Sequence, residues 1–247
     1  MTPLLEACLN GERTPDEHPA IPRTPEELAT DSRAAVDAGA AVLHLHPYDE
    51  AGRQSLAPDP CAAALEAVRA ACPGTPISLS TSAAIEPDPD VRLKLVAAWE
   101  VLPDLVTANQ GEPGIVELCE HLLAREVGIE AGLLSADDAR LFVAAGIADR
   151  CTRVLVEPLD AEPETAVAHA AEMESIVTEA GIELEQVHHG DGLATWAVMR
   201  RGLALGHGTR AGLEDATILP DGSQPAGNAE LVRTAAELIA QFAQDSP

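Results

Sequence analysis

The chain of 247 residues is 46% hydrophobic and carries 41 acidic against 15 basic residues, which gives a formal net charge of −26. A field of this sign repels nucleic acid and anionic membrane surfaces, so we expect neither as a partner. The five cysteines form no Cys-x-x-Cys pair, and no run approaches the ~18 apolar residues of a membrane span, which together favour a cytoplasmic protein in a reducing compartment.

Eight short apolar runs alternate with alanine-rich helical patterns along the chain, which is typical of βα units and a parallel sheet. The runs are residues 4–9, 41–46, 77–81, 105–109, 128–133, 153–157, 185–189 and 208–213. Eight such units predict an α/β fold of one domain, residues 1–247, closed into a (β/α)8 TIM barrel. No Gly-x-Gly-x-x-Gly follows the first run, so an open doubly wound sheet is the alternative without positive support.

The first predicted helix begins at Thr24-Pro25, where threonine can cap the helix and proline suits its first turn. The connection before it, residues 10–23, is the longest between the predicted elements. Long loops on the C-terminal side of barrel strands often carry function. We therefore expect residues 10–23 to close over a pocket.

The second predicted strand carries His44 and His46, two residues apart. Side chains alternate along a strand, so both imidazoles project from one face, with Leu43 and Leu45 on the other. This arrangement suits two ligands of one metal ion, and a catalytic zinc site needs about three protein ligands. A pair of structural, hydrogen-bonded histidines is the alternative interpretation of so short a pattern.

The C-terminal ends of barrel strands meet at one mouth, where catalytic residues gather. Polar residues stand at these ends in chain order: Asn10, Glu12 and Arg13, then His44 and His46, Ser80, Thr81 and Ser82, Thr107 and Asn109, Glu130, Glu157, His188 and His189, and finally Arg210, Glu214 and Asp215. Glu214 and the second histidine pair are the candidate third ligands. Adjacent strand residues face opposite sides, so only one of His188 and His189 can face the barrel interior.

The last cluster adds two further functional groups beside a candidate ligand. Arg210 can hold a carboxylate in a bidentate grip, which lysine cannot. Asp215 follows Glu214 directly and is placed to act as a general base.

Several blocks of the sequence resemble the beta-keto acid cleavage enzyme family, whose best-described activity is 3-keto-5-aminohexanoate cleavage. They are Asn10-Gly11 with residues 18–28 (HPAIPRTPEEL), residues 38–46 (AGAAVLHLH), and residues 210–215 (RAGLED) with 228–232 (NAELV). The similarity runs in order over most of the chain. Family members are zinc-dependent (β/α)8 barrels that form oligomers, so the resemblance implies a Zn²⁺ cofactor and a homotetramer or homodimer.

The resemblance also implies roles for individual residues. His44 and His46 match the two zinc histidines and Glu214 the carboxylate ligand. Asp215 matches the general base, and Arg210 and Ser80 match the groups that position and activate it. Glu12 corresponds to a catalytic glutamate of the first loop, in a loop one residue shorter. Thr107 matches a substrate-contacting residue, and we include Asn109, Thr81 and Asn10 as further substrate-binding candidates.

The implied reaction joins a small anionic beta-keto acid to acetyl-CoA through an enolate and releases acetoacetate and a new CoA ester. The chain departs from the family where an arginine usually follows the second histidine by two positions, since it has Tyr48. A glycine-rich loop near the CoA phosphates is replaced by Glu157-Pro158-Leu159-Asp160. A CoA-independent lyase, a zinc-dependent hydrolase and a non-catalytic ligand-binding barrel are therefore the alternatives.

Overall fold

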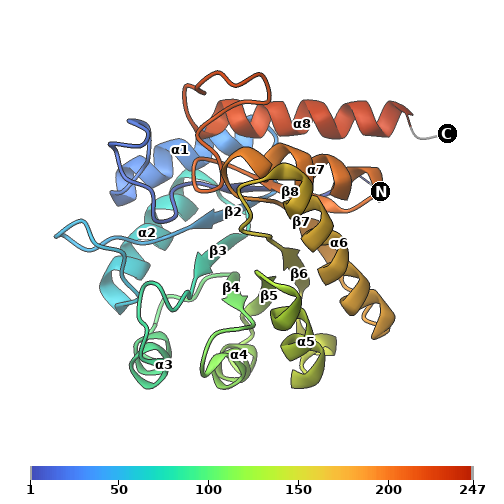
Figure 1. Cartoon of the computed structure of the whole chain (residues 1–247). Coiled ribbons are helices and arrows are strands. Elements are labelled where there is room, and N and C mark those ends of the chain that lie inside the picture. The colour runs from blue at the N-terminus through green and yellow to red at the C-terminus, as the bar shows by residue number, and fades with distance from the viewer. Residues whose placement is uncertain (1, 246–247) are drawn as a thin grey trace.

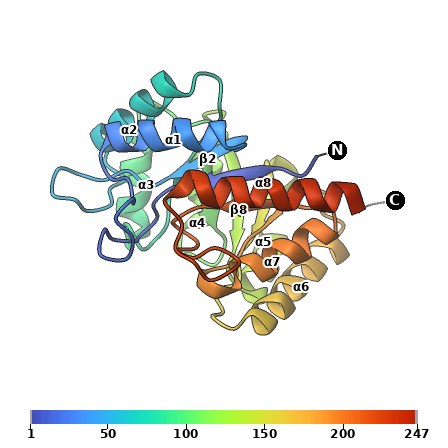
Figure 2. The ribbon, with the colours of Figure 1, turned by 90° about the horizontal axis from the view of Figure 1, so that it is seen from above.

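The computed structural model describes residues 2–245, and the ends of the predicted domain, Met1, Ser246 and Pro247, lie outside the described residues. Eight parallel strands close into a barrel in sequential order, with helices around it (Figures 1 and 2). The strands are β1 Leu5–Cys8, β2 Val42–Leu45, β3 Ile77–Ser80, β4 Leu105–Asn109, β5 Gly128–Leu133, β6 Arg153–Val156, β7 Glu185–His188 and β8 Gly208–Ala211. Pairing of β1 with β8, Leu5 opposite Thr209, closes the ring. The predicted (β/α)8 barrel is confirmed, and the open sheet is excluded.

Each strand leads through a loop to a helix on the outside of the barrel. The helices are α1 Pro25–Asp37, α2 Pro58–Ala71, α3 Pro89–Ala97, α4 Ile115–Leu123, α5 Ala136–Ala145, α6 Pro163–Glu179, α7 Thr195–Ala204 and α8 Asn228–Asp245, with short 3-10 turns at Ala148–Arg150 and Gly192–Ala194. The predicted start of α1 is a full capping box between Thr24 and Glu27. The last helix, α8, packs against α1 and completes the outer layer (Figure 2). None of the helices in the described residues is long and apolar enough to cross a bilayer.

The strands are buried on both faces because helices cover the outside and side chains fill the inside. Leu43 and Leu45 of β2 belong to the apolar layer between sheet and helices, while His44 and His46 alternate with them. The barrel interior below the mouth is polar. There, Glu130 of β5 accepts a hydrogen bond from Arg153 of β6 at 3.2 Å and another from the Ser78 hydroxyl of β3. Glu130, Arg153 and Ser78 form what we call the polar floor, which lies directly behind His44.

Candidate metal centre and active site

A cavity of about 480 Å³ opens at the C-terminal ends of the strands. Its wall includes His44, His46, Arg210 and Glu214, which the sequence places on strands at opposite ends of the chain. The first loop contributes Gly11, Glu12, Arg13 and Glu17 to the same wall. The loop of residues 10–23 thus lies over the cavity, as its length predicts.

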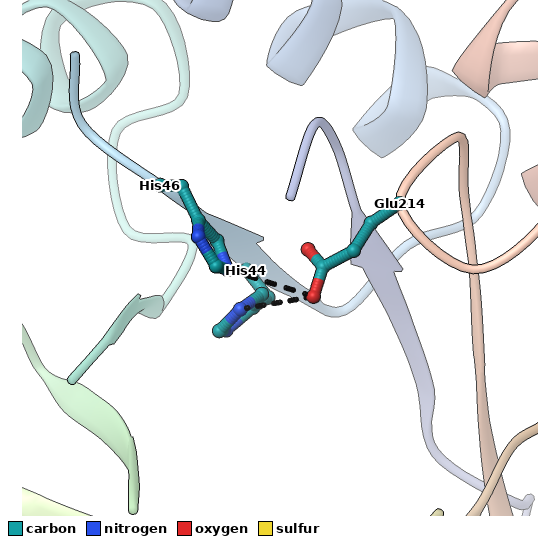
Figure 3. A group of neighbouring side chains, drawn as sticks. All are labelled: His44, His46 and Glu214. Carbon is teal, nitrogen blue, oxygen red and sulfur yellow. Dashed lines mark ion pairs between the residues drawn. The ribbon is translucent and has the colours of Figure 1, made fainter. Parts of the chain in front are cut away.

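The two histidines of β2 and Glu214, after β8, converge on one point. The Nε2 atoms of His44 and His46 each lie 3.6 Å from Oε1 of Glu214 (Figure 3). The two rings are 5.2 Å apart between centroids and nearly perpendicular, at 77°. Both nitrogens therefore face the carboxylate from different directions, which leaves room for an ion between the three groups.

The polar floor fixes the tautomer of His44. Ser78 donates its single hydroxyl proton to Glu130, so towards His44 Nδ1, 3.4 Å away, it can only accept. The Thr107 hydroxyl lies 3.2 Å from the same nitrogen. Thr107 can also donate to Oε2 of Glu130, 3.5 Å away; with both hydroxyl protons given to Glu130, His44 carries its proton on Nδ1 and presents the lone pair of Nε2 to the cavity. Burial also lowers the pKa of His44 to about 3, which keeps the imidazole neutral.

A different residue fixes the tautomer of His46. Gln54, in the loop after β2, donates from Nε2 to the carbonyl of Gly11 at 2.9 Å. This turns its amide oxygen to His46 Nδ1, also at 2.9 Å, so Nδ1 must be the donor. Tyr48 donates to the same Gly11 carbonyl at 2.7 Å. Such partners on the far nitrogen orient metal-bound histidines, and here they free both Nε2 lone pairs.

The third member of the group is a carboxylate that lacks a full set of partners. Oε1 of Glu214 accepts from Arg210 at 3.0 Å, while Oε2 is buried without a hydrogen-bond partner among the described residues. Burial alone would raise the pKa of Glu214, but Arg210 and the two histidines outweigh it and hold the pKa well below its usual range. Burial would lower the pKa of His46, but the Glu214 carboxylate outweighs it and raises the pKa. Two imidazole nitrogens and one carboxylate, with an orphaned oxygen, fit a catalytic zinc site.

Arg210 and Asp215 form a buried pair beside this group. The guanidinium binds Asp215 in a bidentate manner, with Nη2 2.6 Å from Oδ1 and Nε 3.2 Å from Oδ2. Both side chains are 2% exposed. Burial would raise the pKa of Asp215, but Arg210 and then His189 overcome it and lower the pKa. Asp215 is therefore held as an ionised carboxylate behind Arg210.

The local sequence explains why the loop after β8 can bring these groups together. A Cβ at Gly212 would lie 1.8 Å from the carbonyl oxygen of Cys8, so the close approach of this loop to β1 requires glycine. Asn228, at the start of α8, accepts from the backbone N–H of Leu213 and donates to the carbonyl of Leu9, both at 2.7 Å. These contacts connect residues 210–215 with residues 228–232 and hold Glu214 and Asp215 in position.

The second histidine pair divides between the two sides of β7. His189 is fully buried at the mouth, with Nδ1 3.3 Å from Asp215 and Nε2 3.7 Å from Glu157. His188 turns to the helix layer, where its ring stacks on His207 at 4.5 Å between centroids. Neither histidine joins the group of His44, His46 and Glu214. Of the candidate third ligands, the geometry thus favours Glu214.

Glu157, His189 and Asp215 form a second cluster that could in principle hold an ion. The guanidinium of Arg210 already lies 2.6 Å from Asp215 and 3.7 Å from Glu157. Arg210 thus occupies both carboxylate oxygens of Asp215, whereas Oε2 of Glu214 in the first group has no partner among the described residues. The pKa of Glu157 is raised by burial, against the opposing influence of His189 and Arg210.

The predicted catalytic and substrate-binding residues do not all reach the cavity. Ser80, Thr107, Asn109 and Arg210 line it, and Glu12 stands exposed at its rim, whereas Asp215 is buried behind Arg210 and is not part of the cavity wall. Asn10 and Thr81 are turned elsewhere, because their side chains bind backbone groups. Asn10 donates to the carbonyls of Pro22 and His46 and accepts from the N–H of His46, and Thr81 donates to the carbonyl of Thr107. Asn10 and Thr81, which the sequence offered as substrate-binding candidates, thus stabilise the strand ends through these backbone hydrogen bonds.

Two residues with a clear place in the site, Gln54 and Ser78, were not singled out by the sequence, and they orient the histidines. Arg13, named only as a polar residue after the first strand, binds the backbone carbonyls of Glu214 at 2.9 Å and Asp215 at 3.3 Å. Ser78 could have been found, because strand alternation puts it on the same face as Ser80. Gln54 gives no signal in the sequence, since its role depends on how the loop after β2 folds back.

Comparison with known proteins places this geometry in a family context. The family model described as beta-keto acid cleavage enzyme matches residues 4–189 and 159–246. A 3-keto-5-aminohexanoate cleavage enzyme of Acetoanaerobium sticklandii is 32% identical over 93 residues, which are 38% of this chain and 34% of that protein. One of Fusobacterium nucleatum subsp. nucleatum is 31% identical over 108 residues, 44% of this chain and 39% of that protein. The matched segments thus span well under half the length of these curated relatives.

Among solved structures, a ternary complex of ObcA with a C4-CoA adduct and oxalate superposes with a TM-score of 0.75. The two sequences are 17% identical, and the match covers 91% of this chain and 65% of that chain. At this identity, the likeness supports the barrel fold alone.

Proposed function

The chain belongs to the beta-keto acid cleavage enzyme family, and on that premise we propose that it is a zinc-dependent enzyme that cleaves a small anionic beta-keto acid with acetyl-CoA as co-substrate. The convergence of His44, His46 and Glu214 on one point of the cavity carries this proposal. The adjacent pair of Arg210 and Asp215 adds a fixed carboxylate to the same mouth.

The residues present fit the metal that the family implies. His44 and His46 would bind through Nε2, and Glu214 through its carboxylate, whose Oε2 has no other partner among the described residues. Bound there, zinc would supply Lewis acidity to a carbonyl oxygen and offset the repulsion between a −26 protein and an anionic substrate.

Asp215 is the proposed general base. It would take a proton from the carbon between the keto and carboxylate groups of the substrate, leaving an enolate, and for this it would have to reach past Arg210, which lies between it and the cavity. Arg210 holds the carboxylate ionised and oriented through two hydrogen bonds. The lowered pKa makes Asp215 a weak base, so removal of the proton depends on strong acidification of the substrate carbon. Ser80, Thr107 and Asn109 provide a neutral polar wall on the other side of the cavity.

The proposed bond changes balance without a further reactant. The enolate carbon attacks the thioester carbonyl of acetyl-CoA, and the CoA thiolate leaves. The thiolate then attacks the original keto carbon, the bond between that carbon and the former enolate carbon breaks, and the released enolate of acetoacetate takes back the proton held by Asp215. The products are acetoacetate and a CoA ester of the remaining acyl group. Glu12, exposed at the rim, is the proposed catalytic carboxylate of the first loop.

One observation favours a CoA-independent cleavage as the second candidate. Both arginines of the cavity wall are already paired with carboxylates, Arg13 with Glu17 and Asp191, and Arg210 with Glu214 and Asp215. The loop after β6 adds the negative charges of Glu157 and Asp160. A pyrophosphate group gains little from such surroundings, because no cation of this wall is free for it.

Metal analysis followed by a substrate panel tests the proposal. We expect about one zinc ion per chain, and turnover of at least one beta-keto acid. Formation of a CoA ester separates the two candidates, since the CoA-independent route forms none. The Asp215→Asn variant should retain zinc and lose about a hundredfold or more in kcat. Asp221→Asn, the same change in an exposed loop, is the control. A protein that binds no zinc, or that turns over no member of the panel when loaded, would refute the proposal.

A further inference from the structure

The loop after β4 contains a carboxylate that the proposed mechanism does not use. Glu112 accepts two hydrogen bonds on Oε1, from Nδ2 of Asn109 at 3.0 Å and from the hydroxyl of Ser82 at 3.3 Å. Both donors line the cavity that holds the candidate metal ligands. Glu112 thus stands directly behind one part of the cavity wall.

Glu112 is itself held in place by a buried cation. Arg92 of α3 is 1% exposed, and its Nη1 lies 2.6 Å from Oε2 of Glu112. Its Nη2 donates to the carbonyl of Pro113, the next residue in the loop. A buried arginine without its partner would be costly, so this pair fixes both the position and the charge behind the wall.

The charge of Glu112 decides which way round the Asn109 amide stands. An amide can present either NH2 or oxygen to a neighbour, but a carboxylate only accepts. Nδ2 must therefore face Glu112, and Oδ1 turns to Gly132 of β5, where a Cβ would lie 2.5 Å from it. One N–H of Asn109 is used by Glu112. The second N–H of the Asn109 amide makes no hydrogen bond to any group within residues 2–245. Ser82 has already given its only proton to Glu112.

We propose that Glu112, held by Arg92, is a positioning residue that turns the second N–H of Asn109 towards the carboxylate of a beta-keto acid in the cavity. The inference rests on the proposed function for the identity of the ligand. In the opposite orientation, Oδ1 of Asn109 would face the cavity and repel an anion. The pair of Arg92 and Glu112, which we call the clamp, therefore makes Asn109 a hydrogen-bond donor to carboxylates, although Asn109 carries no positive charge of its own.

Paired substitutions test the clamp without leaving a buried charge. Arg92→Met with Glu112→Met removes the pair and the acceptor, whereas Arg92→Met with Glu112→Gln removes the charges but retains an amide oxygen. Binding of malonate, a non-reactive 1,3-dicarboxylate, to the zinc-loaded proteins is measured by calorimetry. We expect the Met pair to weaken malonate binding about tenfold and the Gln pair to lose less. For a turned-over substrate, KM should rise with kcat little changed.

The substitution Asn109→Ala supplies the decisive comparison. If Glu112 acts through Asn109, the Met pair should cost little more in the Asn109→Ala background. Equal malonate affinity of the Met pair and the parent, with zinc content and thermal unfolding also unchanged, would overturn the clamp. So would a full tenfold loss that persists without Asn109. Failure of the substrate panel with malonate binding intact would instead refute the cleavage activity and leave the clamp standing.

Discussion

Replacing Gln54 by leucine should weaken zinc binding without touching a metal ligand. The change removes the 2.9 Å hydrogen bond to His46 Nδ1 and the 2.9 Å bond to the Gly11 carbonyl. His46 then loses the partner that keeps its proton on Nδ1, and the tautomer with a blocked Nε2 becomes competitive. Loss of such an outer partner typically costs 10- to 100-fold in metal affinity, which is about 1.4 to 2.7 kcal/mol.

Competition with a fluorescent zinc chelator measures this loss directly. Gln110→Leu is the matched control, because Gln110 is a buried glutamine that donates to the Ala108 carbonyl at 2.8 Å and does not contact the metal group. Its zinc affinity should equal that of the parent. If Gln54→Leu binds zinc within a factor of about two of the control, the tautomer argument fails and the histidines are oriented by something else.

Three further predictions concern the scaffold. Gly212→Ala places a methyl group 1.8 Å from the Cys8 carbonyl oxygen, so the loop after β8 must move. We expect about 3 kcal/mol lower stability and weaker zinc binding. An unchanged denaturation midpoint would contradict this. Burial raises the pKa of Asp31 to about 6 from 3.8, so the folded state holds this proton more tightly. Its contribution to stability is present below pH 4 and is lost as pH rises through about 6, by at most about 3 kcal/mol. Asp31→Asn should flatten that part of the stability profile, and an identical slope would refute it. Light scattering should give two or four times the chain mass of 25.7 kDa, as the homodimer or homotetramer prediction requires, and a monomer mass would contradict it.

The barrel was predictable because the strands are short and most are apolar on their outer face; β7, with Gln186 and His188 on that face, is an exception. All eight predicted runs contain a strand, but several strands end one or two residues early. His46, Glu157 and His189 fall just beyond β2, β6 and β7. Beyond these strand ends, His46 and Glu157 line the cavity, and His189 lies buried against Asp215. The alternation of side chains therefore predicts the face on which a residue lies more accurately than it predicts the residue at which a strand ends.

The partners of the histidines were harder to predict because they depend on loop folding and strand register. The loop after β2 folds back through a bridge between Tyr48 and Gln54, which brings Gln54 under His46. No local pattern encodes that return. Alternation likewise says that one of His188 and His189 faces inward, but the choice follows from the pairing of β7 with its neighbours, in which His188 lies opposite Thr209.

Arg13, in the first loop, links opening of the cavity to the position of Glu214 in the candidate metal site. Arg13 binds the backbone carbonyls of Glu214 and Asp215 and also pairs with Asp191 beyond β7. The loop cannot swing aside without releasing the segment that carries Glu214, the proposed carboxylate ligand. Exchange of the ion with a chelator should therefore proceed at the pace of loop opening. A metal centre gated in this way would be kinetically slow to exchange even if its equilibrium affinity were ordinary.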